Sequence, residues 1–574
     1  MDIFAPNDRL RRREWVRLTV LLAVAFGLRL GAVAAGPGLT APPRFGSDEY
    51  EYDLCAWNLV RGNGYVGVSP DVVDATGRPR EHVTAYRPPV ATLFFASVYV
   101  VAGHNYAAAH MADTALATFT VLLVFAIAGR LFGRGAAWLA AVVYAFYPLA
   151  IYYNLTLLSE SQGAFLVCLF VWLCLPIAGP RGLRWAGGAG VALGLLLLCK
   201  PGFVFLMPLL GIWALAVCGR SRALWLRAAV IPACAGLAIL PWAVRNHQEF
   251  GGVIPFSTGG GSLLLQANNR LVVADPKYHG YAVWDTSLPE YAAALRAPND
   301  EIARDAVAKQ FAIAWLKENP DKWFYLARGK VWRLWTPSYF GGQNRAAARI
   351  ASVYYGTILL AFGLAVLPVT AWLVRRRDPG LIVLCPIVAT VAMAIVFHGQ
   401  HRYRFPIDSL CMVVAAGGVM GLVRAVAEGK LRARVRALVA SRRIQVGLVA
   451  AAGLGIAWVA ACRWDDERIQ AFRADLARQR VAALETAVEA YRAKYGRLPD
   501  PLETLVPDFL PTLEALHAPG TSLEYFEYRR LATADATRVP GVVCYEIVAE
   551  PQATPPFRIR QTKGLPPDPV GGRP

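Results

Sequence analysis

Long apolar segments repeat along most of the chain, and they constrain its fold more than any other feature. A helix needs about 20 apolar residues to cross a bilayer, within a range of about 17–25. Segments close to that length lie at 18–35, 107–128, 135–153, 163–179, 184–199, 201–219, 223–243, 351–374, 380–397, 405–424 and 444–462. The chain is 56% hydrophobic and only 17% charged, whereas soluble domains are about 25% charged. We therefore expect a mainly α protein, a polytopic membrane bundle of about 11 spans.

The positions of Lys and Arg predict which ends of the spans face the cytoplasm. These residues are enriched in cytoplasmic loops, and here they crowd the N-terminal residues 1–17 and several short turns between spans. The basic turns contain Arg130, Arg134, Arg181, Arg184, Arg220, Arg222, Arg375, Arg376 and Arg377. Placing them inside leaves outer loops at 36–106 and 244–350, a short outer turn at 154–162, and everything after 462 outside.

One apolar segment does not fit the series of spans. Residues 90–102 are too short to cross a bilayer, and counting them as a span would put every later basic turn outside. We expect a juxtamembrane helix there. The basic N-terminus precedes a long apolar run, and no small-residue cleavage site is convincing, so we expect the first span to be retained as an anchor.

Charge and cysteine content exclude two other classes of protein. The net charge is 59 − 40 = +19, but the basic residues lie at the ends of apolar segments, so we expect no nucleic-acid partner. The ten Cys are scattered, without a CxxC pair or a Cys/His ligand spacing. We therefore predict neither a disulfide framework nor an essential metal.

Two acidic elements lie in the predicted outer loops. Asp48 and Glu49 follow the first span, and the helical spacing would place Asp48 with Tyr52 on one face. Glu160 lies in the outer turn NLTLLSESQ. Acids at an anionic membrane surface are unfavourable unless they are paired or used. The alternatives are helix-capping acids in a solvated loop and an ordinary polar turn.

A set of cations returns to the same predicted outer level from distant parts of the chain. It comprises Arg87, Lys200, Arg245, His398, His401, Arg402 and Arg404. Several cations on the outer side run against the usual distribution of charge and indicate an anionic ligand. Arg suits a phosphate because its guanidinium donates two parallel hydrogen bonds. Snorkelling toward lipid headgroups is the alternative for any single one of them.

Together these two sets predict a definite chemistry. A lipid-linked phosphosugar would place its phosphate on the cations and its sugar near the acid. The acid could then take a proton from an acceptor hydroxyl or amine as that group attacks the anomeric carbon. Phosphate is already a good leaving group when cations stabilise it, so one base and a cation cluster suffice.

The residues also resemble those of polytopic GT-C glycosyltransferases, namely bacterial relatives of the dolichyl-phosphate-mannose protein mannosyltransferases and the aminoarabinose transferases. The matching features are Asp48-Glu49 with NLVRGNGY and RPP, Glu160, PWAVRNHQEFG, STGGGSLLLQANN and HRYRFPI, which together cover residues 15–425. We expect the segment STGGGSLLLQANN (257–269) to form a flexible loop.

The resemblance implies inverting transfer of a sugar from a polyprenyl- or dolichyl-phosphate outside the cytoplasm. By that resemblance Asp48 is the general base, Glu49 supports it, and Glu160 assists the acceptor or the geometry of the site. The motifs add Tyr52, Asn246 and Tyr403 to the substrate-binding residues. Some relatives use a divalent metal, although no ligand spacing is visible here.

Beyond residue 425 the chain changes character. Residues 426–462 are a basic linker and the last span, and residues 463–560 begin with an amphipathic helix. The sequence AYRAKYGRLPDPLETLV resembles type IV pilins and type II secretion pseudopilins. We predict a small α+β extracytoplasmic domain at 463–560, either an accessory for acceptors and protein contacts or a cap without a ligand. Residues 561–574 are expected to be disordered.

The leading interpretation is a bacterial inner-membrane glycosyltransferase with 18–425 as its catalytic module. Its partners would be a polyprenyl-phosphate sugar, membrane lipids and a protein, lipid or polysaccharide acceptor. One rival is a lipid-linked saccharide flippase, which should carry polar groups at mid-membrane, and the other is an anchor for the pilin-like domain. The span interiors are mostly apolar. Arg29 is the main exception, and we expect it to snorkel.

Overall fold

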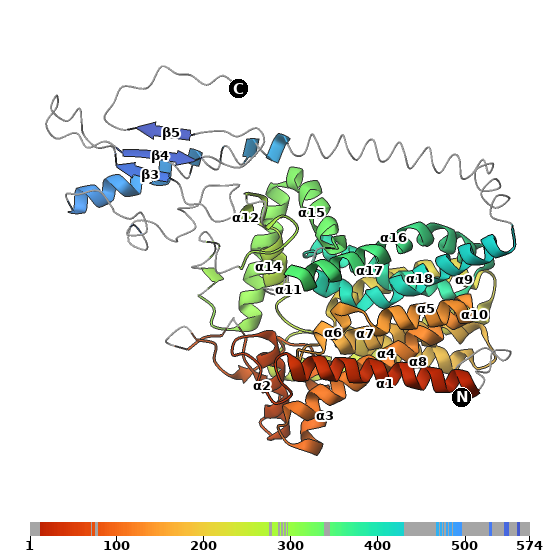
Figure 1. The fold of residues 1–574 in the computed structure, drawn as a ribbon. Helices are drawn as coiled ribbons and strands as arrows, with labels where there is room; N and C mark the ends of the chain where they lie inside the picture. The colour runs from red at the N-terminus through yellow and green to blue at the C-terminus, as the bar shows by residue number, and fades with distance from the viewer. Residues whose placement is uncertain are drawn as a thin grey trace. The chain divides into compact units, whose positions relative to one another are not determined.

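A computed structural model shows a predominantly helical protein (Figure 1). It describes residues 12–69, 72–74, 78–274, 278–284, 297–337 and 345–429, with single residues between 288 and 295 and scattered residues between 467 and 505. Three short strands in the C-terminal part are also described. The chain divides into two compact units, of which the first comprises residues 1–260, 299–305 and 331–445.

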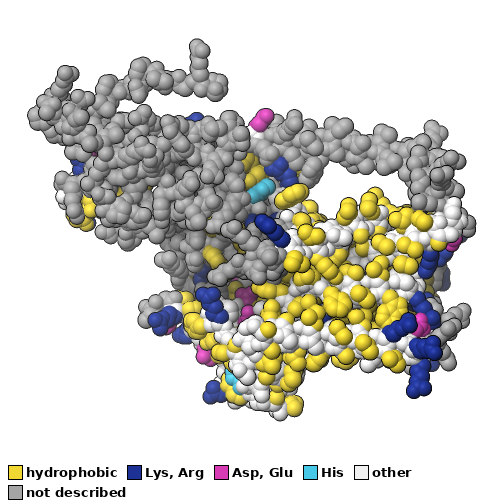
Figure 2. Space-filling model, in the orientation of Figure 1, with side chains coloured by type: hydrophobic (Ala, Val, Ile, Leu, Met, Phe, Trp, Pro, Cys, Tyr) yellow, Lys and Arg dark blue, Asp and Glu magenta, His cyan; other side chains and the backbone are white. Residues whose placement is uncertain are grey.

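The first unit is a bundle of long apolar helices. They are α1 (Arg12–Ala35), α4 (Tyr106–Phe132), α5 (Arg134–Ala145), α6 (Pro148–Tyr153), α7 (Glu160–Cys174), α8 (Gly182–Leu197), α9 (Leu206–Cys218), α10 (Arg222–Phe250), α16 (Arg345–Arg376), α17 (Cys385–Val396) and α18 (His401–Ala427). Their shared core contains small, aliphatic and aromatic side chains, with Ala137, Val167 and Phe170 fully buried. The face of the bundle seen in Figure 2 is broadly hydrophobic, as expected of helices that contact lipid.

The helical part confirms the predicted mainly α membrane fold. Among the described residues, eight helices, counting their 3-10 extensions, are long and apolar enough to cross a bilayer. Of the other predicted spans, 184–199 coincides with the shorter α8, 135–153 is divided between α5 and α6, and 444–462 lies outside the described residues. The count of 11 stays a prediction.

Arg29 lies inside the bundle, and the break between α5 and α6 provides the carbonyl groups that it binds there. Pro148 begins α6 and has no N–H, so it cannot supply the donor that Tyr144 O would accept in a continuous helix. The buried Arg29 guanidinium donates to Ala145 O at 2.9 Å and to Tyr144 O at 3.2 Å. The expected snorkelling is therefore wrong, since Arg29 caps a neighbouring helix inside the bundle.

The predicted inner turns meet at one end of the bundle. Arg134 pairs with Glu14 at 3.0 Å, and Arg424 donates to Phe132 O at 3.1 Å. Arg227 donates to Ile177 O at 2.8 Å. In Figure 2, Lys and Arg gather at the end of the bundle where α1 begins.

The first outer loop folds on the opposite end. It contains α2 (Asp48–Val60), the two-stranded pair β1 (Val66–Gly67) and β2 (His82–Val83), and α3 (Pro89–Ala102). β1 and β2 are antiparallel, with Val66 opposite Val83. The predicted juxtamembrane segment is thus a helix of 14 residues. Near its C-terminal end Tyr99 bonds Asp53 of α2, as does His104 just beyond it.

The second compact unit comprises residues 261–298, 306–330 and 446–574. It contains α11 (Gly260–Ala267) almost entirely, α12 (Arg270–Ala274), most of α14 (Glu301–Glu318) and the first part of α15 (Trp323–Trp335). Ile469, from the predicted amphipathic helix, is buried in its core with Leu265 and Leu326. The second outer loop, predicted as one part of the 18–425 module, is therefore shared between two units.

Two expectations about local structure need correction. The segment 257–269 is not simply a loop, because α11 begins at Gly260 and its Leu side chains pack into the core of the second unit. Antiparallel strands β3 (Glu527–Arg530), β4 (Tyr545–Ala549) and β5 (Ile559–Thr562) follow near the C-terminus. β5 crosses the predicted boundary at residue 560, so residues 561 and 562 are ordered strand. The pilin-like identity stays a prediction.

Candidate active site

The acidic motif begins a helix, and this fixes the direction of its carboxylates. Ser47 is the N-cap of α2, and its Oγ accepts the backbone N–H of Tyr50 at 3.3 Å. Asp48, Glu49 and Glu51 occupy the first turn, where the helix dipole favours negative charge. Asp48 and Glu51 are three residues apart and share one face of α2.

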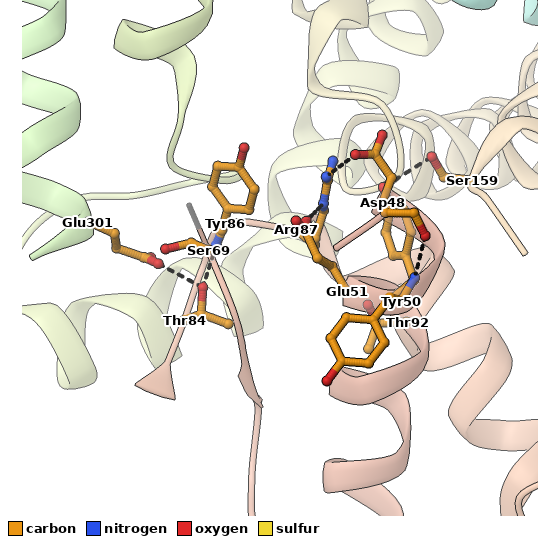
Figure 3. A network of polar contacts seen from close by, with 12 residues as sticks. Asp48, Tyr50, Glu51, Ser69, Thr84, Tyr86, Arg87, Thr92, Ser159 and Glu301 are labelled. Atoms are coloured by element: carbon orange, nitrogen blue, oxygen red, sulfur yellow. Dashed lines mark hydrogen bonds and ion pairs between the residues drawn. The ribbon is translucent and has the colours of Figure 1, made fainter. Parts of the chain in front are cut away.

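Arg87 joins the two acids on that face. Its Nη2 donates to Asp48 Oδ1 at 2.5 Å and its Nε to Glu51 Oε2 at 2.5 Å (Figure 3). The guanidinium carbon also lies 5.4 Å from the centre of the Tyr52 ring. Because Pro88 and Pro89 follow directly and begin α3, the chain is extended at this point and Arg87 is held at the start of a helix.

A second arginine reaches Asp48 from the far end of the sequence. Arg402 lies in the first turn of α18, and its Nη1 donates to Asp48 Oδ2. Its Nε donates to Glu160 Oε1 at 2.5 Å. Lys200, just before a 3-10 turn, donates to the same Glu160 oxygen at 2.7 Å. Elements more than 350 residues apart in sequence therefore meet at one set of ion pairs.

These six residues form what we call the ion cluster: Asp48, Glu51, Arg87, Glu160, Lys200 and Arg402. Three carboxylates face three cations, so the formal charges cancel. The side chain of Glu160 is 1% exposed, whereas that of Asp48 is 34% exposed and that of Arg402 is 26% exposed. The cluster is thus closed at Glu160 and open to its surroundings at Asp48.

The three acids in the first turn of α2 have different surroundings, and these shift their pKa values in different directions. Burial alone would raise the pKa of Asp48, but the guanidinium groups of Arg87 and Arg402 hold it well below its usual range. Burial raises the pKa of Glu49, which accepts only the Leu157 N–H at 3.4 Å, and it also raises that of Glu51. Asp48 is the most acidic of the three.

The outer turn before α7 is tied to α2. Tyr52 donates its hydroxyl hydrogen to Ser159 Oγ at 3.1 Å, and burial raises the pKa of Tyr52 to about 12. Glu160, the first residue of α7, follows Ser159 directly. The contact therefore sets the distance between the two predicted acidic elements.

Several predicted substrate-binding residues lie outside the ion cluster. Arg245 donates to Thr84 O at 2.9 Å, and Asn246 is buried and donates to Ile254 O at 2.9 Å. Both hold loop backbone in place. Tyr403 and the buried His398 contact each other at 3.4 Å, and His401 is the first residue of α18.

Arg404 is a structural cation. It is 3% exposed, pairs with the fully buried Asp408 at 3.1 Å and donates to Leu334 O at 2.7 Å. Tyr147 and Tyr355 donate to the same Asp408 carboxylate. Its guanidinium thus bonds protein groups through both Nε and Nη1. A role for Arg404 in binding a phosphate stays a prediction.

Glu301 holds the first outer loop in place and was missed by the sequence reading. Its side chain is 2% exposed and accepts bonds from Thr84 Oγ1 at 2.7 Å and from the Ala85 N–H at 2.8 Å. His82 Nε2 lies 3.0 Å from the same carboxylate. Thr84 is three residues before Arg87, and Figure 3 shows this junction beside the ion cluster.

The sequence reading also missed the partner of Arg87 and a buried acid behind the site. Glu51 was detectable, because it follows Asp48 by three residues in a helical pattern. Asp113 of α4 is fully buried and accepts bonds from Asn154, Ser161 and Gln162 at 2.7–3.0 Å. It packs the outer turn against the bundle. Among the residues described, no group of three His, Cys, Asp or Glu side chains is arranged to hold a metal ion.

Part of the chain matches a known protein family. Residues 86–244 match the sequence profile of the family described as dolichyl-phosphate-mannose-protein mannosyltransferase. This segment includes Arg87, Glu160 and Lys200 of the ion cluster. A search of curated proteins finds no match.

Solved structures with some likeness include an archaeal oligosaccharyltransferase. The oligosaccharyltransferase AglB from Archaeoglobus fulgidus, in complex with an inhibitory peptide and a dolichol-phosphate, is 16% identical with a TM-score of 0.47 over 91% of this chain and 62% of that chain. Its apo form has a TM-score of 0.45 at 15% identity, over 76% and 54% of the two chains. The chain thus spans little more than half the length of these archaeal proteins.

ArnT from Cupriavidus metallidurans, bound to undecaprenyl phosphate, is 16% identical with a TM-score of 0.34, over 72% of this chain and 80% of that chain. The family match supports the predicted resemblance over residues 86–244. The chain therefore combines a polytopic bundle of apolar helices with a segment, residues 86–244, that is similar to this mannosyltransferase family.

Proposed function

We propose that the protein transfers a sugar from a polyprenyl-phosphate donor to an acceptor hydroxyl or amine on the extracytoplasmic side of the bacterial inner membrane. The observation that carries this proposal is the ion cluster, in which Asp48 lies between the guanidinium groups of Arg87 and Arg402. Arginine forks of this kind match the oxygens of a phosphate. The solved relatives named with dolichol-phosphate and undecaprenyl phosphate agree with such a donor.

The transfer would proceed with inversion in one displacement. The acceptor oxygen or nitrogen forms a bond to the anomeric carbon, and the bond from that carbon to the phosphate oxygen breaks. The electron pair of the broken bond goes to the phosphate, where Arg87, Lys200 and Arg402 stabilise the charge. The acceptor proton goes to Asp48, while Glu49 supports this base and Glu160 holds Arg402 and Lys200 in place.

The test is a transfer assay with the full chain purified in detergent. Radiolabelled polyprenyl-phosphate sugars are incubated singly with a periplasmic extract as acceptor, and label leaving the lipid is counted. We expect one donor to be consumed by the wild type and Asp48→Asn to lower that rate by about a thousandfold, the scale of losing a general base. Equal consumption by Asp48→Asn would exclude Asp48 as the base. A donor that binds but is never consumed would favour a transporter.

A further inference from the structure

Asp48 is poorly suited to accept a proton while both guanidinium groups contact it. One carboxylate oxygen accepts from Arg87 and the other from Arg402, so each is occupied by a charged donor. A carboxylate held this way is a weak base. The proposed function therefore requires something to remove these partners before the acceptor reacts.

The same two guanidinium groups are the cations that would bind the donor phosphate. A phosphate has the charge sign and the paired oxygens of a carboxylate, and it offers more acceptor oxygens to the two forks. It cannot occupy the forks of Arg87 and Arg402 while Asp48 holds them. Asp48 thus occupies the phosphate-binding position in the ligand-free site.

We propose that Asp48 acts as an internal stand-in for the donor phosphate, and that donor binding releases it from Arg87 and Arg402 to become the base. This inference rests on the proposed function. The phosphate of the donor takes over the two guanidinium groups, and the freed carboxylate is left without its counter-ions. Without those cations its affinity for a proton rises. The base is therefore activated only in sites that already hold a donor.

The arrangement of the other acids makes Asp48 the one that moves. Glu160 is closed from its surroundings and is held by both Lys200 and Arg402. Glu51 is 12% exposed and bonds Arg87 through Nε, which leaves the Nη2 fork to Asp48. Asp48 is the most exposed carboxylate of the ion cluster, so its displacement requires the least rearrangement.

The inference predicts opposite effects of one substitution on binding and on transfer. Asp48→Asn removes the competing anion, so the variant should bind a lipid phosphate about tenfold more tightly than the wild type. That is the scale expected when partly exposed ion pairs no longer have to be broken. The same variant should transfer sugar about a thousandfold more slowly than the wild type. Asp48→Glu keeps an anion at the same helical position and should bind with an affinity within about threefold of the wild type.

The measurement is the Kd of decaprenyl phosphate for the full chain in detergent micelles, followed by microscale thermophoresis at fixed salt. Tighter binding by Asp48→Asn together with near-wild-type binding by Asp48→Glu supports the stand-in role. Equal or weaker binding by Asp48→Asn overturns it while leaving the lipid-phosphate donor intact. If neither the wild type nor any variant binds decaprenyl phosphate, both this inference and the proposed function fail.

Folding is checked separately, because Asp48 is half of two ion pairs. Asp48→Asn should elute as a single species of wild-type size and should unfold within a few degrees of the wild type. Glu51→Gln provides a second variant, since it also removes an anion from Arg87 but leaves Asp48 in place. We expect Glu51→Gln to change the lipid-phosphate Kd less than Asp48→Asn. An equal or larger gain in Glu51→Gln would contradict the assignment to Asp48.

Discussion

At the scale of single residues, Arg402 and Arg404 illustrate how two similar side chains on one helix differ in role. Arg402 contacts acids at the open side of the ion cluster, whereas Arg404 is buried with Asp408. We predict that Arg402→Lys weakens binding of decaprenyl phosphate at least tenfold, because lysine lacks the planar fork. Arg404→Lys should instead lower the temperature of unfolding and leave the Kd of the folded fraction unchanged. The two variants are compared by thermal unfolding and ligand titration.

Glu160 gives a second prediction at this scale. Replacing it with Gln leaves Lys200 and Arg402 without their shared buried partner, so we expect the free energy of unfolding to fall by about 3 kcal/mol. Adding Lys200→Met to Glu160→Gln removes one of the unpaired charges. The double variant should therefore be more stable than Glu160→Gln alone in thermal unfolding. Additive losses would show that the two side chains are not coupled.

At the scale of elements, the start of α14 controls the segment that leads to Arg87. His82 is bound by Glu301, and this carboxylate raises the pKa of His82 although burial alone would lower it. A raised pKa in the folded state stabilises the fold fully below the unfolded pKa of about 6.5. The contribution is lost as the pH rises through the higher folded value.

We therefore predict that the temperature of unfolding falls as the pH increases from about 6 to 8, and that His82→Gln reduces this fall. The comparison is made by thermal unfolding in one detergent at constant ionic strength. Glu301→Gln is the matched variant, since it removes the carboxylate that acts on His82. A pH dependence unchanged in both variants would rule out this junction as its source.

The same scale shows what the sequence could predict and what it could not. The apolar segments located the spans, and the predicted positions of acids and cations at the outer ends of the spans grouped Asp48, Glu160, Arg87 and Arg402. The sequence could not separate Arg402 from Arg404, because linear order does not say which face of α18 contacts which neighbour. Residues two positions apart, such as Arg402 and Arg404, point in directions about 200° apart around the helix axis. The acid four residues after Arg404 was the available signal for a structural pair.

Other features depended on tertiary contacts that have no local signal. Glu301 lies more than 200 residues from the loop it holds, and nothing in its own neighbourhood marks it as a partner of Thr84. The segment 257–269 contains three consecutive Gly, yet Leu264 and Leu265 gain burial by forming α11. Tertiary burial there outweighs the low helix propensity of Gly.

At the scale of the whole molecule, the basic turns and the ion cluster lie at opposite ends of one bundle. We predict that they lie on opposite sides of the membrane, as the distribution of Lys and Arg requires. Single cysteines at Arg61 and Arg222, both exposed, test this with a membrane-impermeant maleimide on intact bacterial cells. Arg61→Cys should be labelled in intact cells, and Arg222→Cys only after permeabilisation. Labelling of Arg222→Cys alone in intact cells would reverse the orientation.

The cancelling charges of the ion cluster affect how the site discriminates between its ligand and the surrounding phospholipids. A membrane surface is full of ordinary phospholipids, each carrying a phosphate that an excess of fixed positive charge would attract from a distance. A site whose cations are already neutralised exerts almost no such pull. Ordinary headgroups then gain little electrostatic energy by approaching the site. On the proposed mechanism, a lipid binds only if its phosphate fits closely enough to replace Asp48. On this mechanism, a minor lipid can be bound selectively in the presence of a large excess of other phospholipids.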